Sequence, residues 1–466
     1  MTNKTDLRVS IIGAGMGGLA AALAFAKKGF TNIHVYEDAP ALGFVGAGIQ
    51  MAPNMIRLLD QLGVWAKSSI KDEATQVEEV VIHDGASNKL LVRVPMTDIG
   101  DKYEYPHYAG HRASLAEGIY DAAKAEPAVK FHFKKTLQYV EDFGPGKAKF
   151  IVKDENGKPQ IVETDVLIGA DGIKSKVRES ILAHLNLAAD ILETGTAAYR
   201  ILLPRELLEP HPYLMYMLNS NTVRRWIGEN RHIIAYPIHN HSIFNIASVQ
   251  PDVNFAGATN ATWTNKGSKK AMKQVFEDFN PIVQQLLDLV PGDDVVEWRL
   301  RCHKPLDTWT CGAVTLLGDA CHPTLPHLSQ GAAMAIEDAA TLAEALSLMP
   351  GDGSDREAIE TTLKVYELLR KPRTSTLVDL AVQSAQALHL GAGNAREERD
   401  RQFAAAAKTG TAPVPDRWFV HTDKGLKCTA ELSHFLRRTI LWNFVAAIRG
   451  TATECERFAD EMSGLT

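Results

Sequence analysis

The stretch LRVSIIGAGMGG, residues 7–18, decides the fold of this chain. Residues 7–12 are a short run rich in β-branched side chains, which ends at a glycine cluster. The alanine-rich segment 19–28 follows and predicts a helix, and residues 33–37 predict a second short strand. Strand, glycine turn, helix and strand within about thirty residues are typical of a βαβ unit.

The glycine cluster contains the pattern G-x-G-x-x-G at Gly13, Gly15 and Gly18. The first glycine allows the tight turn, the second leaves room for a phosphate, and the third lets the helix pack closely on the strand. Ala14 lies within this predicted cofactor turn, and Glu37 ends the next strand, where its carboxylate can hold ribose hydroxyls. Because a carboxylate repels a 2′-phosphate, the motif predicts FAD or NAD at this site, not NADP.

Composition excludes several classes of protein. The 466 residues are 45% hydrophobic and 23% charged, which is close to the globular average and excludes a disordered or fibrous chain. A net charge of −6 argues against a nucleic-acid or membrane-surface binder. Five cysteines without a C-x-x-C exclude a disulfide scaffold. The start of the chain carries no convincing secretory signal, so we expect a soluble, cytoplasmic protein.

No metal site is expected. Cys302-His303 and Cys321-His322 pair a thiol with an imidazole, but they lack the two paired ligand spacings of a zinc site.

Two further motifs have the same design as each other. In VLIGADG, residues 166–172, an apolar strand delivers Asp171 to a turn, and a basic helical stretch follows. In VTLLGDACHP, residues 314–323, another apolar strand delivers Asp319 to a loop, and a helix led by Gly331 follows. A chance occurrence of both motifs, in this order after the glycine motif, is improbable.

Together the three motifs resemble the FAD-binding architecture of the single-component (class A) flavoprotein aromatic hydroxylases, over about residues 7–375. The resemblance implies that Asp171 serves FAD and the reducing nicotinamide, and that Asp319 holds hydroxyls of FAD. It also implies that Arg112 lies near the FAD pyrophosphate and ribityl chain. The remaining cofactor positions that it implies are Gly48, Pro323, Gly331 and Ala332.

A narrower resemblance connects residues 46–54, 323–331 and 370–373 with the salicylate hydroxylase branch, which includes 3-hydroxybenzoate 6-hydroxylase and 6-hydroxynicotinate 3-monooxygenase. The sequence departs from that branch at His327, where tyrosine is common, and after about residue 380. The resemblance implies an NAD(P)H- and O₂-dependent monooxygenase that works through a flavin C4a-hydroperoxide. Its most specific form is decarboxylative hydroxylation of salicylate to a catechol.

Several alternatives stay open beside that reading. The substrate could be another phenol, either 3-hydroxybenzoate-like or a fungal secondary metabolite. A non-catalytic flavin-binding regulatory protein would also keep the cofactor motifs. A flavin-dependent halogenase would usually show W-x-W-x-I-P, which is absent, and an NAD dehydrogenase would leave the second and third motifs without a role.

Candidate catalytic residues lie in RHIIAYPI, residues 231–238. A base near a substrate hydroxyl favours the reactive phenolate, and the resemblance points to His232 for that role. In a strand, Tyr236 shares a face with His232, so we take it as a pocket hydrogen-bond donor. The other substrate-pocket candidates are Gln50, Arg200, Pro326 and His327.

We expect an α/β fold in which a Rossmann-type FAD-binding domain with a parallel sheet is assembled from residues 1–75, 105–190 and 285–350. Residues 76–104 and 191–284 are expected to form a mainly antiparallel substrate domain, and residues 351–466 a helical C-terminal region. Residues 161–168 and 310–317 each predict a single strand, and residues 395–408 predict a solvated helix. Helical tails in this family favour a homodimer, and the single G-x-G-x-x-G indicates that NAD(P)H visits transiently.

Overall fold

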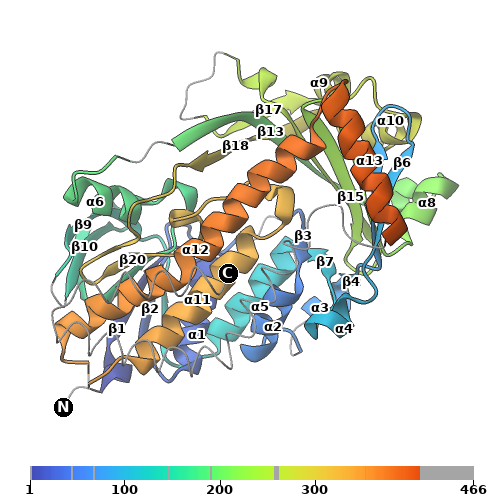
Figure 1. The fold of residues 1–466 in the computed structure, drawn as a ribbon. Coiled ribbons are helices and arrows are strands. Elements are labelled where there is room, and N and C mark those ends of the chain that lie inside the picture. The colour runs from blue at the N-terminus through green and yellow to red at the C-terminus, as the bar shows by residue number, and fades with distance from the viewer. Residues whose placement is uncertain are drawn as a thin grey trace.

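The computed structural model describes residues 3–43, 46–66, 69–144, 147–188, 191–256, 262–351 and 353–409. Its fold is the expected α/β class, with one mostly parallel sheet, several antiparallel strands and long helices (Figure 1). The part of the predicted helical region that follows Thr409 lies outside the described residues.

The first layer is a six-stranded sheet in the order β19-β20-β12-β1-β2-β8. Five of its strands run parallel, and β19 turns back against β20. The strands are β1 (Arg8–Ile12), β2 (Asn32–Tyr36), β8 (Val129–His132), β12 (Val166–Gly169), β19 (Thr310–Cys311) and β20 (Val314–Leu316). The prediction of one strand over residues 310–317 is therefore wrong: Gly312, with a φ of +55°, makes the segment a short hairpin.

Helices cover this sheet because their small apolar residues allow close approach. Helix α1 (Met16–Lys27) buries every residue from Gly18 to Phe25 and packs against α5 (Arg112–Lys124) and α11 (Gly331–Leu348). Helix α12 (Arg356–Leu388) runs along α11 and reaches from this layer towards the other end of the molecule (Figure 1).

A three-stranded meander joins the parallel sheet to its second motif. It consists of β9 (Thr136–Asp142), β10 (Ala148–Lys153) and β11 (Pro159–Thr164). The single strand predicted over residues 161–168 is wrong, because the chain changes sheets at Asp165. The Asp165 carboxylate accepts a hydrogen bond from the backbone N–H of Arg8 at 2.8 Å, which anchors the change of direction beside β1.

The second large layer is an eight-stranded sheet in the order β17-β18-β13-β16-β15-β14-β5-β6. All neighbours are antiparallel except β14 and β5. The strands are β5 (Glu79–Asp84), β6 (Leu90–Pro95), β13 (Ile191–Pro204), β14 (Thr222–Gly228), β15 (Arg231–Ile238), β16 (Ile243–Pro251), β17 (Thr264–Ser268) and β18 (Asp294–His303). Strand β18 carries this sheet to His303, beyond the boundary expected at residue 284.

One face of the eight-stranded sheet is covered by short helices and a core of its own. This core contains Trp226, Ile233 and Ala235. The covering helices are α7 (Arg205–Leu208), α8 (Pro212–Leu218), α9 (Lys269–Val275) and α10 (Pro281–Asp288). Figure 1 shows α8, α9 and α10 at the top and right of the molecule. Alternation along β15 then leaves the opposite face of the sheet for His232 and Tyr236.

A small sheet lies between the two layers. It has the order β3-β7-β4, with β3 (Gly48–Met51), β4 (Thr75–Gln76) and β7 (Tyr108–His111). The helices beside it are α2 (Pro53–Gln61), α3 (Ile70–Glu73) and α4 (Ile99–Tyr103), and α6 (Lys176–His184) follows β12.

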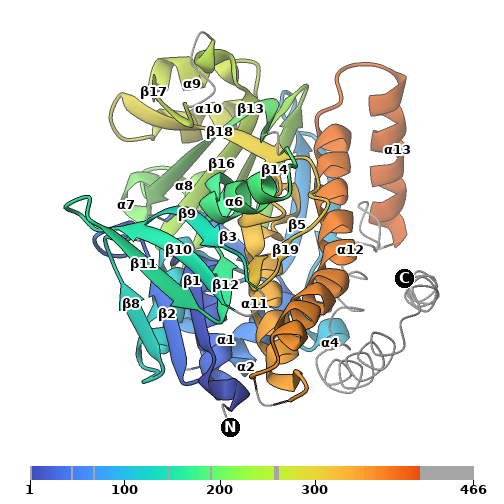
Figure 2. The same cartoon turned by 90° about the vertical axis from the view of Figure 1, so that its left-hand side faces the viewer.

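Helix α13 (Asn394–Thr409) confirms the helix predicted over residues 395–408, and most of its described side chains are exposed, but one face of it is packed. It packs against β6, and Phe403 is buried in a cluster with Ile82 and Leu388. Arg396 pairs with Asp84 of β5. Figure 2 shows α13 standing beside α12 against the eight-stranded sheet. Phe403 is the one aromatic residue of this charged and alanine-rich helix, and its burial attaches the helix to the sheet.

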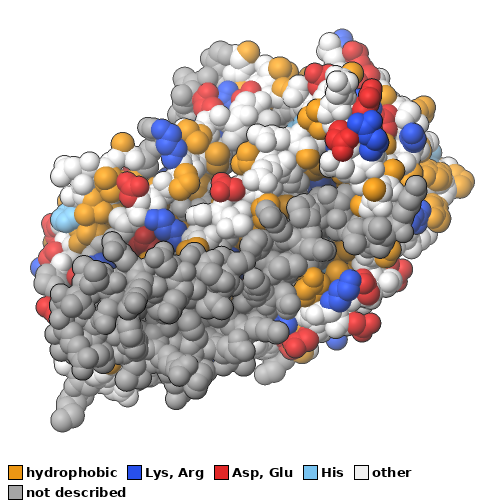
Figure 3. Space-filling model, viewed as in Figure 1, with side chains coloured by type: hydrophobic (Ala, Val, Ile, Leu, Met, Phe, Trp, Pro, Cys, Tyr) orange, Lys and Arg blue, Asp and Glu red, His pale blue; other side chains and the backbone are white. Residues whose placement is uncertain are grey.

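The face of the molecule drawn in Figure 3 mixes acidic, basic and apolar side chains over the described part. Within the described residues, no helix combines the length and the apolar character needed to cross a bilayer.

Candidate active site

The glycine turn between β1 and α1 has the geometry that its spacing predicts. Gly13 has a φ of +98°, and a Cβ on Gly18 would lie 2.0 Å from the carbonyl oxygen of Gly13. By contrast, a Cβ on Gly15 would meet no atom within 4 Å. The first and last glycines therefore close the turn, while the middle one borders open space at the N-terminus of α1, where backbone N–H groups favour an anion.

Glu37 lies beside this turn, as predicted. Its Oε2 accepts a hydrogen bond from the N–H of Ala14 at 2.8 Å, and its Oε1 accepts one from Ala39 at 3.0 Å. These two bonds hold the carboxylate against the turn. Since a carboxylate has about four acceptor positions, each oxygen can still accept a hydrogen bond from a hydroxyl of a bound ribose.

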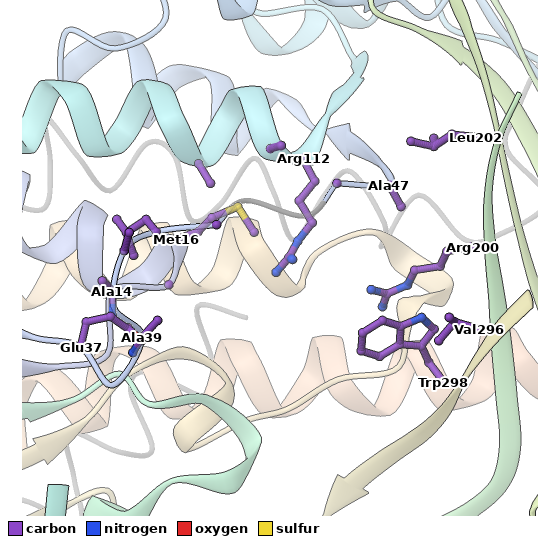
Figure 4. Close-up of a pocket in the computed structure, with 17 residues that line it drawn as sticks. Ala14, Met16, Glu37, Ala39, Ala47, Arg112, Arg200, Leu202, Val296 and Trp298 are labelled. Atoms are coloured by element: carbon purple, nitrogen blue, oxygen red, sulfur yellow. The ribbon is translucent and has the colours of Figure 1, made fainter. Parts of the chain in front are cut away.

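A cleft of about 570 Å³ runs from this turn to the eight-stranded sheet. Figure 4 shows Glu37 and Met16 at one end, Arg112 in the middle, and Arg200 beside Trp298 at the other end. The guanidinium of Arg200 lies 5.3 Å from the ring centroid of Trp298. Burial and the charge of Arg112 lower the pKa of Arg200. Two cations on one cleft favour an anionic ligand between them.

The third motif places the Asp319 side chain where solvent reaches it, although protein surrounds it on several sides. Gly318 turns the chain at a φ of +64°, and the Asp319 side chain is solvent-exposed. Protein nevertheless surrounds the carboxyl closely enough to raise its pKa. An exposed side chain with protein around it is one that points into a cavity, which suits the predicted contact with cofactor hydroxyls.

Asp171 is engaged with its own turn. Its carboxylate accepts hydrogen bonds from the Ser175 hydroxyl at 2.6 Å and from the N–H groups of Lys176 and Val177 at 2.7 and 3.3 Å. Burial still raises the pKa of Asp171 above its usual value. The carboxylate thus fixes the start of α6, and a direct contact with FAD stays a prediction.

Arg178 connects the second and third motifs, and the sequence analysis missed it. It is buried and donates hydrogen bonds to the carbonyls of Ile173 at 2.7 Å and Ala320 at 3.1 Å. The basic stretch after Asp171 was the available signal for it.

The segment 370–373 holds the start of α11 through a buried charge network. Arg370 Nε donates to Asp338 at 2.7 Å, and His322 Nε2 lies 2.6 Å from the same carboxylate. Arg370 and Arg373 both pair with Glu337 at 2.8 Å. Burial would raise the pKa of Glu337, but the two arginines hold it far below its usual value.

This network positions the loop that leads into α11. Asn54 donates to Glu337 at 2.8 Å and to Gln330 at 3.0 Å. Pro323 and Pro326 lie in the loop, Gly331 and Ala332 are the first residues of α11, and His327 is buried between them. Cys321, His322 and Asp338 have ligand atoms within 4.8 Å of one another, but Arg370 already neutralises that carboxylate.

Two of the predicted residues, Gly48 and Gln50, lie on strand β3 of the small sheet and do not line the cleft. The Gly48 N–H donates to Asn245 at 2.6 Å, and a Cβ there would lie 2.7 Å from the ring of Tyr236. Gln50 is buried, and its Oε1 lies 3.1 Å from His107 Nε2. Gly48 therefore allows the close approach of β3 to the eight-stranded sheet, while Gln50 is paired within the protein.

His232 belongs to a cluster of three histidines. Its Nδ1 lies 2.7 Å from Nε2 of His389, and its ring centroid lies 5.4 Å from that of His327. His389 follows the end of α12, in the part of the chain where the resemblance fades, so no signal in the sequence pointed to it. These contacts join three segments that are far apart in the chain.

All three imidazoles are neutral near pH 7. Burial, followed by the charge of Arg225, lowers the pKa of His232 well below its usual value, that of His327 to about 3 and that of His389 to about 4. A neutral imidazole can accept a proton, which is the requirement for a general base. Burial raises the pKa of Tyr236, so its hydroxyl remains a donor.

The residues of the cleft fit FAD. The open space at Gly15, the carboxylate of Glu37 and the guanidinium of Arg112 line the cleft and offer partners to phosphate, ribose and ribityl groups. The charge of Arg112 also acts on the carboxyl of Asp319 and lowers its pKa against the effect of burial.

Comparisons with known proteins show the family of the chain. A family model described as "FAD binding domain" matches residues 6–381. A 3-hydroxybenzoate 6-hydroxylase of Polaromonas naphthalenivorans is 33% identical over 382 residues, covering 81% of this chain and 86% of the relative. An FAD-dependent monooxygenase of a Nectria species is 30% identical, covering 88% and 92%. A salicylate hydroxylase substrate complex has the same fold, with a TM-score of 0.70, 22% identity, and coverage of 90% and 99%.

Proposed function

Because the chain belongs to the FAD-binding-domain family of class A flavoprotein aromatic hydroxylases, we propose that it hydroxylates a small phenolic aromatic acid. The observation that carries this proposal is the neutral His232–His389 pair on the face of the eight-stranded sheet that looks towards the loop of the third motif, where His327 lies. A base there serves no purpose in cofactor binding. It suits a substrate whose hydroxyl must lose a proton before the ring is attacked.

When bound, FAD supplies the reduction by NAD(P)H and the activation of O₂. The residues of the chain position the partners and move one proton. Nε2 of His232 has no hydrogen-bond partner among the described residues, so it is available to accept the proton of the substrate hydroxyl. Tyr236, on the same face, can donate to an oxygen of the substrate, and the ring of His327 reaches His232 from the loop before α11.

The network of Arg370, Asp338 and Glu337 acts on the site indirectly, through the position of helix α11. It fixes the helix start at Gly331, whose free N–H groups favour negative charge beside them. We infer that this end of α11 stabilises the anionic form of the reduced ring system.

The most specific form of the proposal is salicylate-type decarboxylative hydroxylation to a catechol. Hydroxylation with the carboxylate retained is a second candidate, favoured by the 33% identity to a 3-hydroxybenzoate 6-hydroxylase. The two differ in the fate of the carboxylate and not in the need for a base at the hydroxyl.

The test uses the purified FAD-loaded protein in air. NADH and NADPH consumption is followed with salicylate, with 3-hydroxybenzoate and without either, and the products are identified. Catechol formed in proportion to coenzyme supports the first form, and a dihydroxybenzoate supports the second. A flavin-loaded protein that never responds to either acid would contradict the proposal and favour the regulatory alternative.

A further inference from the structure

Asn245 lies on β16, between a residue of the cleft and a residue of the candidate substrate pocket. It pairs with Leu202 of β13 on one side and with Tyr236 of β15 on the other. Residues that lie directly opposite each other in a sheet point to the same face, and Leu202 lines the cleft. Asn245 therefore lies on the face where the cofactor cleft meets the pocket, and the proposed chemistry has not yet used it.

The side-chain amide of Asn245 connects this face to the cofactor half of the molecule. The side chain is fully buried, and its Oδ1 accepts a hydrogen bond from the N–H of Gly48 at 2.6 Å. The preceding residue, Ala47, lines the cleft, and its carbonyl accepts a hydrogen bond from the N–H of Arg112 at 3.0 Å (Figure 4). One amide thus joins the sheet face that carries Tyr236 to the backbone that borders Arg112.

The nitrogen of the same amide has no partner. Because the Gly48 N–H is a donor, the amide must present its oxygen to β3, which turns Nδ2 away from that bond. Nδ2 of Asn245 has no hydrogen-bond acceptor in the part of the chain that the structure describes. A buried amide nitrogen without an acceptor is destabilising, and an apolar side chain would avoid that cost. Stability alone therefore does not explain an asparagine at this position.

The hairpin that carries Asn245 is attached to the cofactor half at a second point. The turn between β15 and β16 places His239, Asn240 and His241 in succession at φ values of +50°, +51° and +60°. Residues other than glycine rarely adopt this conformation, so the surroundings must hold it. The N–H of Asn240 donates to the carbonyl of Glu73, the last residue of α3, at 2.9 Å. The hairpin is therefore fixed against α3 at its turn and against β3 along its length.

We propose that Asn245 is a positioning residue, which fixes the distance between the cofactor cleft and the substrate face of the sheet. This inference rests on the proposed function. Hydroxylation requires the substrate ring and the cofactor to meet at a set distance and orientation, and a displacement of about 1 Å can cost about 100-fold in rate. Without the bond to Gly48, β3 can move away from Tyr236 while each half of the molecule keeps its own fold.

Substitutions of the FAD-loaded protein test this role. Asn245→Ala removes the acceptor for the Gly48 N–H, and Asn245→Asp keeps an oxygen in its place. Ser248→Ala is the matched control. The Ser248 hydroxyl also accepts a hydrogen bond from a backbone N–H, that of Tyr199 at 3.0 Å, but alternation along β16 places it on the opposite face of the sheet.

The rate of hydroxylation and the product formed per coenzyme oxidised are measured with salicylate and with 3-hydroxybenzoate. We expect Asn245→Ala to lower kcat about tenfold or more, with KM changed less than about twofold and the surplus coenzyme appearing as hydrogen peroxide. Asn245→Asp should recover most of the rate at saturating substrate, and Ser248→Ala should keep it. Wild-type coupling in Asn245→Ala, or an equal loss in Asn245→Asp or in Ser248→Ala, would overturn the inference.

Hydrogen exchange gives a second measurement that does not depend on turnover. The peptide that contains residues 46–54 is followed by mass spectrometry in the same variants. We expect one amide of this peptide to exchange at least about fivefold faster in Asn245→Ala, as for one lost hydrogen bond, and not in Ser248→Ala. Unchanged exchange in Asn245→Ala would show that the bond to Gly48 does not hold β3, and would overturn the inference.

The two proposals fail in different ways. Equal coupling in the wild type and in Asn245→Ala would overturn the role of Asn245 and leave hydroxylation standing. A wild type that turns over neither salicylate nor 3-hydroxybenzoate would overturn the proposed function, and the positioning role with it.

Discussion

Nε2 of His389 lies 2.7 Å from Nδ1 of His232, although 157 residues separate the two in the chain. The contact joins the end of α12 to the middle of the eight-stranded sheet. The backbone agrees, since the N–H of Asn230 donates to the carbonyl of His389 at 3.0 Å. The C-terminal helices thus complete the candidate substrate pocket and do more than cover the fold.

Replacing His232 tests the proposed base. We expect His232→Ala to lower the rate of hydroxylation by about 100-fold or more while FAD content stays at the wild-type level. Coenzyme consumption and product are measured together, because an enzyme without the base can still oxidise NAD(P)H. Full coupled turnover in this variant would contradict the assignment.

Replacing His389 tests its partnership with His232. We expect His389→Ala to lower hydroxylation by about tenfold, as for one lost hydrogen bond. Since the charge of His389 also depresses the pKa of His232, the acid limb of the pH profile should move to higher pH. His241→Ala, on a half-buried turn, is the control. An unchanged pH profile in His389→Ala would mean that the contact has no role in proton transfer.

The open space at Gly15 is tested by filling it. A Cβ there meets no protein atom, so Gly15→Ala should fold normally but lose about tenfold or more in FAD affinity. Gly267→Ala, on β17, is the matched control and should keep the cofactor. The measurement is a titration of the two apoproteins with FAD. Equal FAD affinities of Gly15→Ala and Gly267→Ala would show that no phosphate of FAD binds at this turn.

Arg370 should matter for stability far more than an exposed ion pair does. Arg370→Gln leaves Asp338 and Glu337 underpaired in the interior, so we expect a loss of about 3–5 kcal/mol in the free energy of unfolding. Arg356→Gln removes the more exposed pair with Asp165 and should cost about 1 kcal/mol or less. Denaturant unfolding of both variants decides the matter. Similar losses would show that the buried network has no special role.

Acid should destabilise the protein from about pH 6.5 downward. Burial lowers the pKa of His107, His303 and His389 to about 4 in the folded state, so the unfolded chain takes up protons first as pH falls. Each such histidine removes at most about 1.4 kcal/mol per pH unit between pH 6.5 and 4. Denaturant unfolding at pH 7 and pH 5 measures the slope, and His107→Asn should reduce it. A slope of zero would contradict these buried neutral histidines.

Local patterns predicted the cofactor half of the molecule well, because each of its motifs is a short strand followed by a turn. The G-x-G-x-x-G turn follows β1, Glu37 bonds to that turn from the end of β2, and Asp319 follows β20, while their contacts with FAD stay predictions. Tertiary context decided the rest. The hairpin at Gly312 and the change of sheet at Asp165 interrupt runs that look continuous in sequence.

The substrate half depends on contacts between distant segments. His232 was recognisable through the family resemblance of its segment, and Tyr236 because it shares a face of the same strand. His389 was missed, since its relevance comes from where α12 ends.

The central claim is that the sheet face carrying His232 and Tyr236 is a site for hydroxylating an aromatic acid. The most direct test is a turnover of the FAD-loaded protein with NADH, salicylate and ¹⁸O₂, followed by mass analysis of the product. We predict a catechol that carries one ¹⁸O atom and has lost the carboxylate, formed by the wild type and lost in His232→Ala. Coenzyme oxidation that yields only hydrogen peroxide and no ¹⁸O-labelled product, with salicylate or with 3-hydroxybenzoate in its place, would contradict the claim.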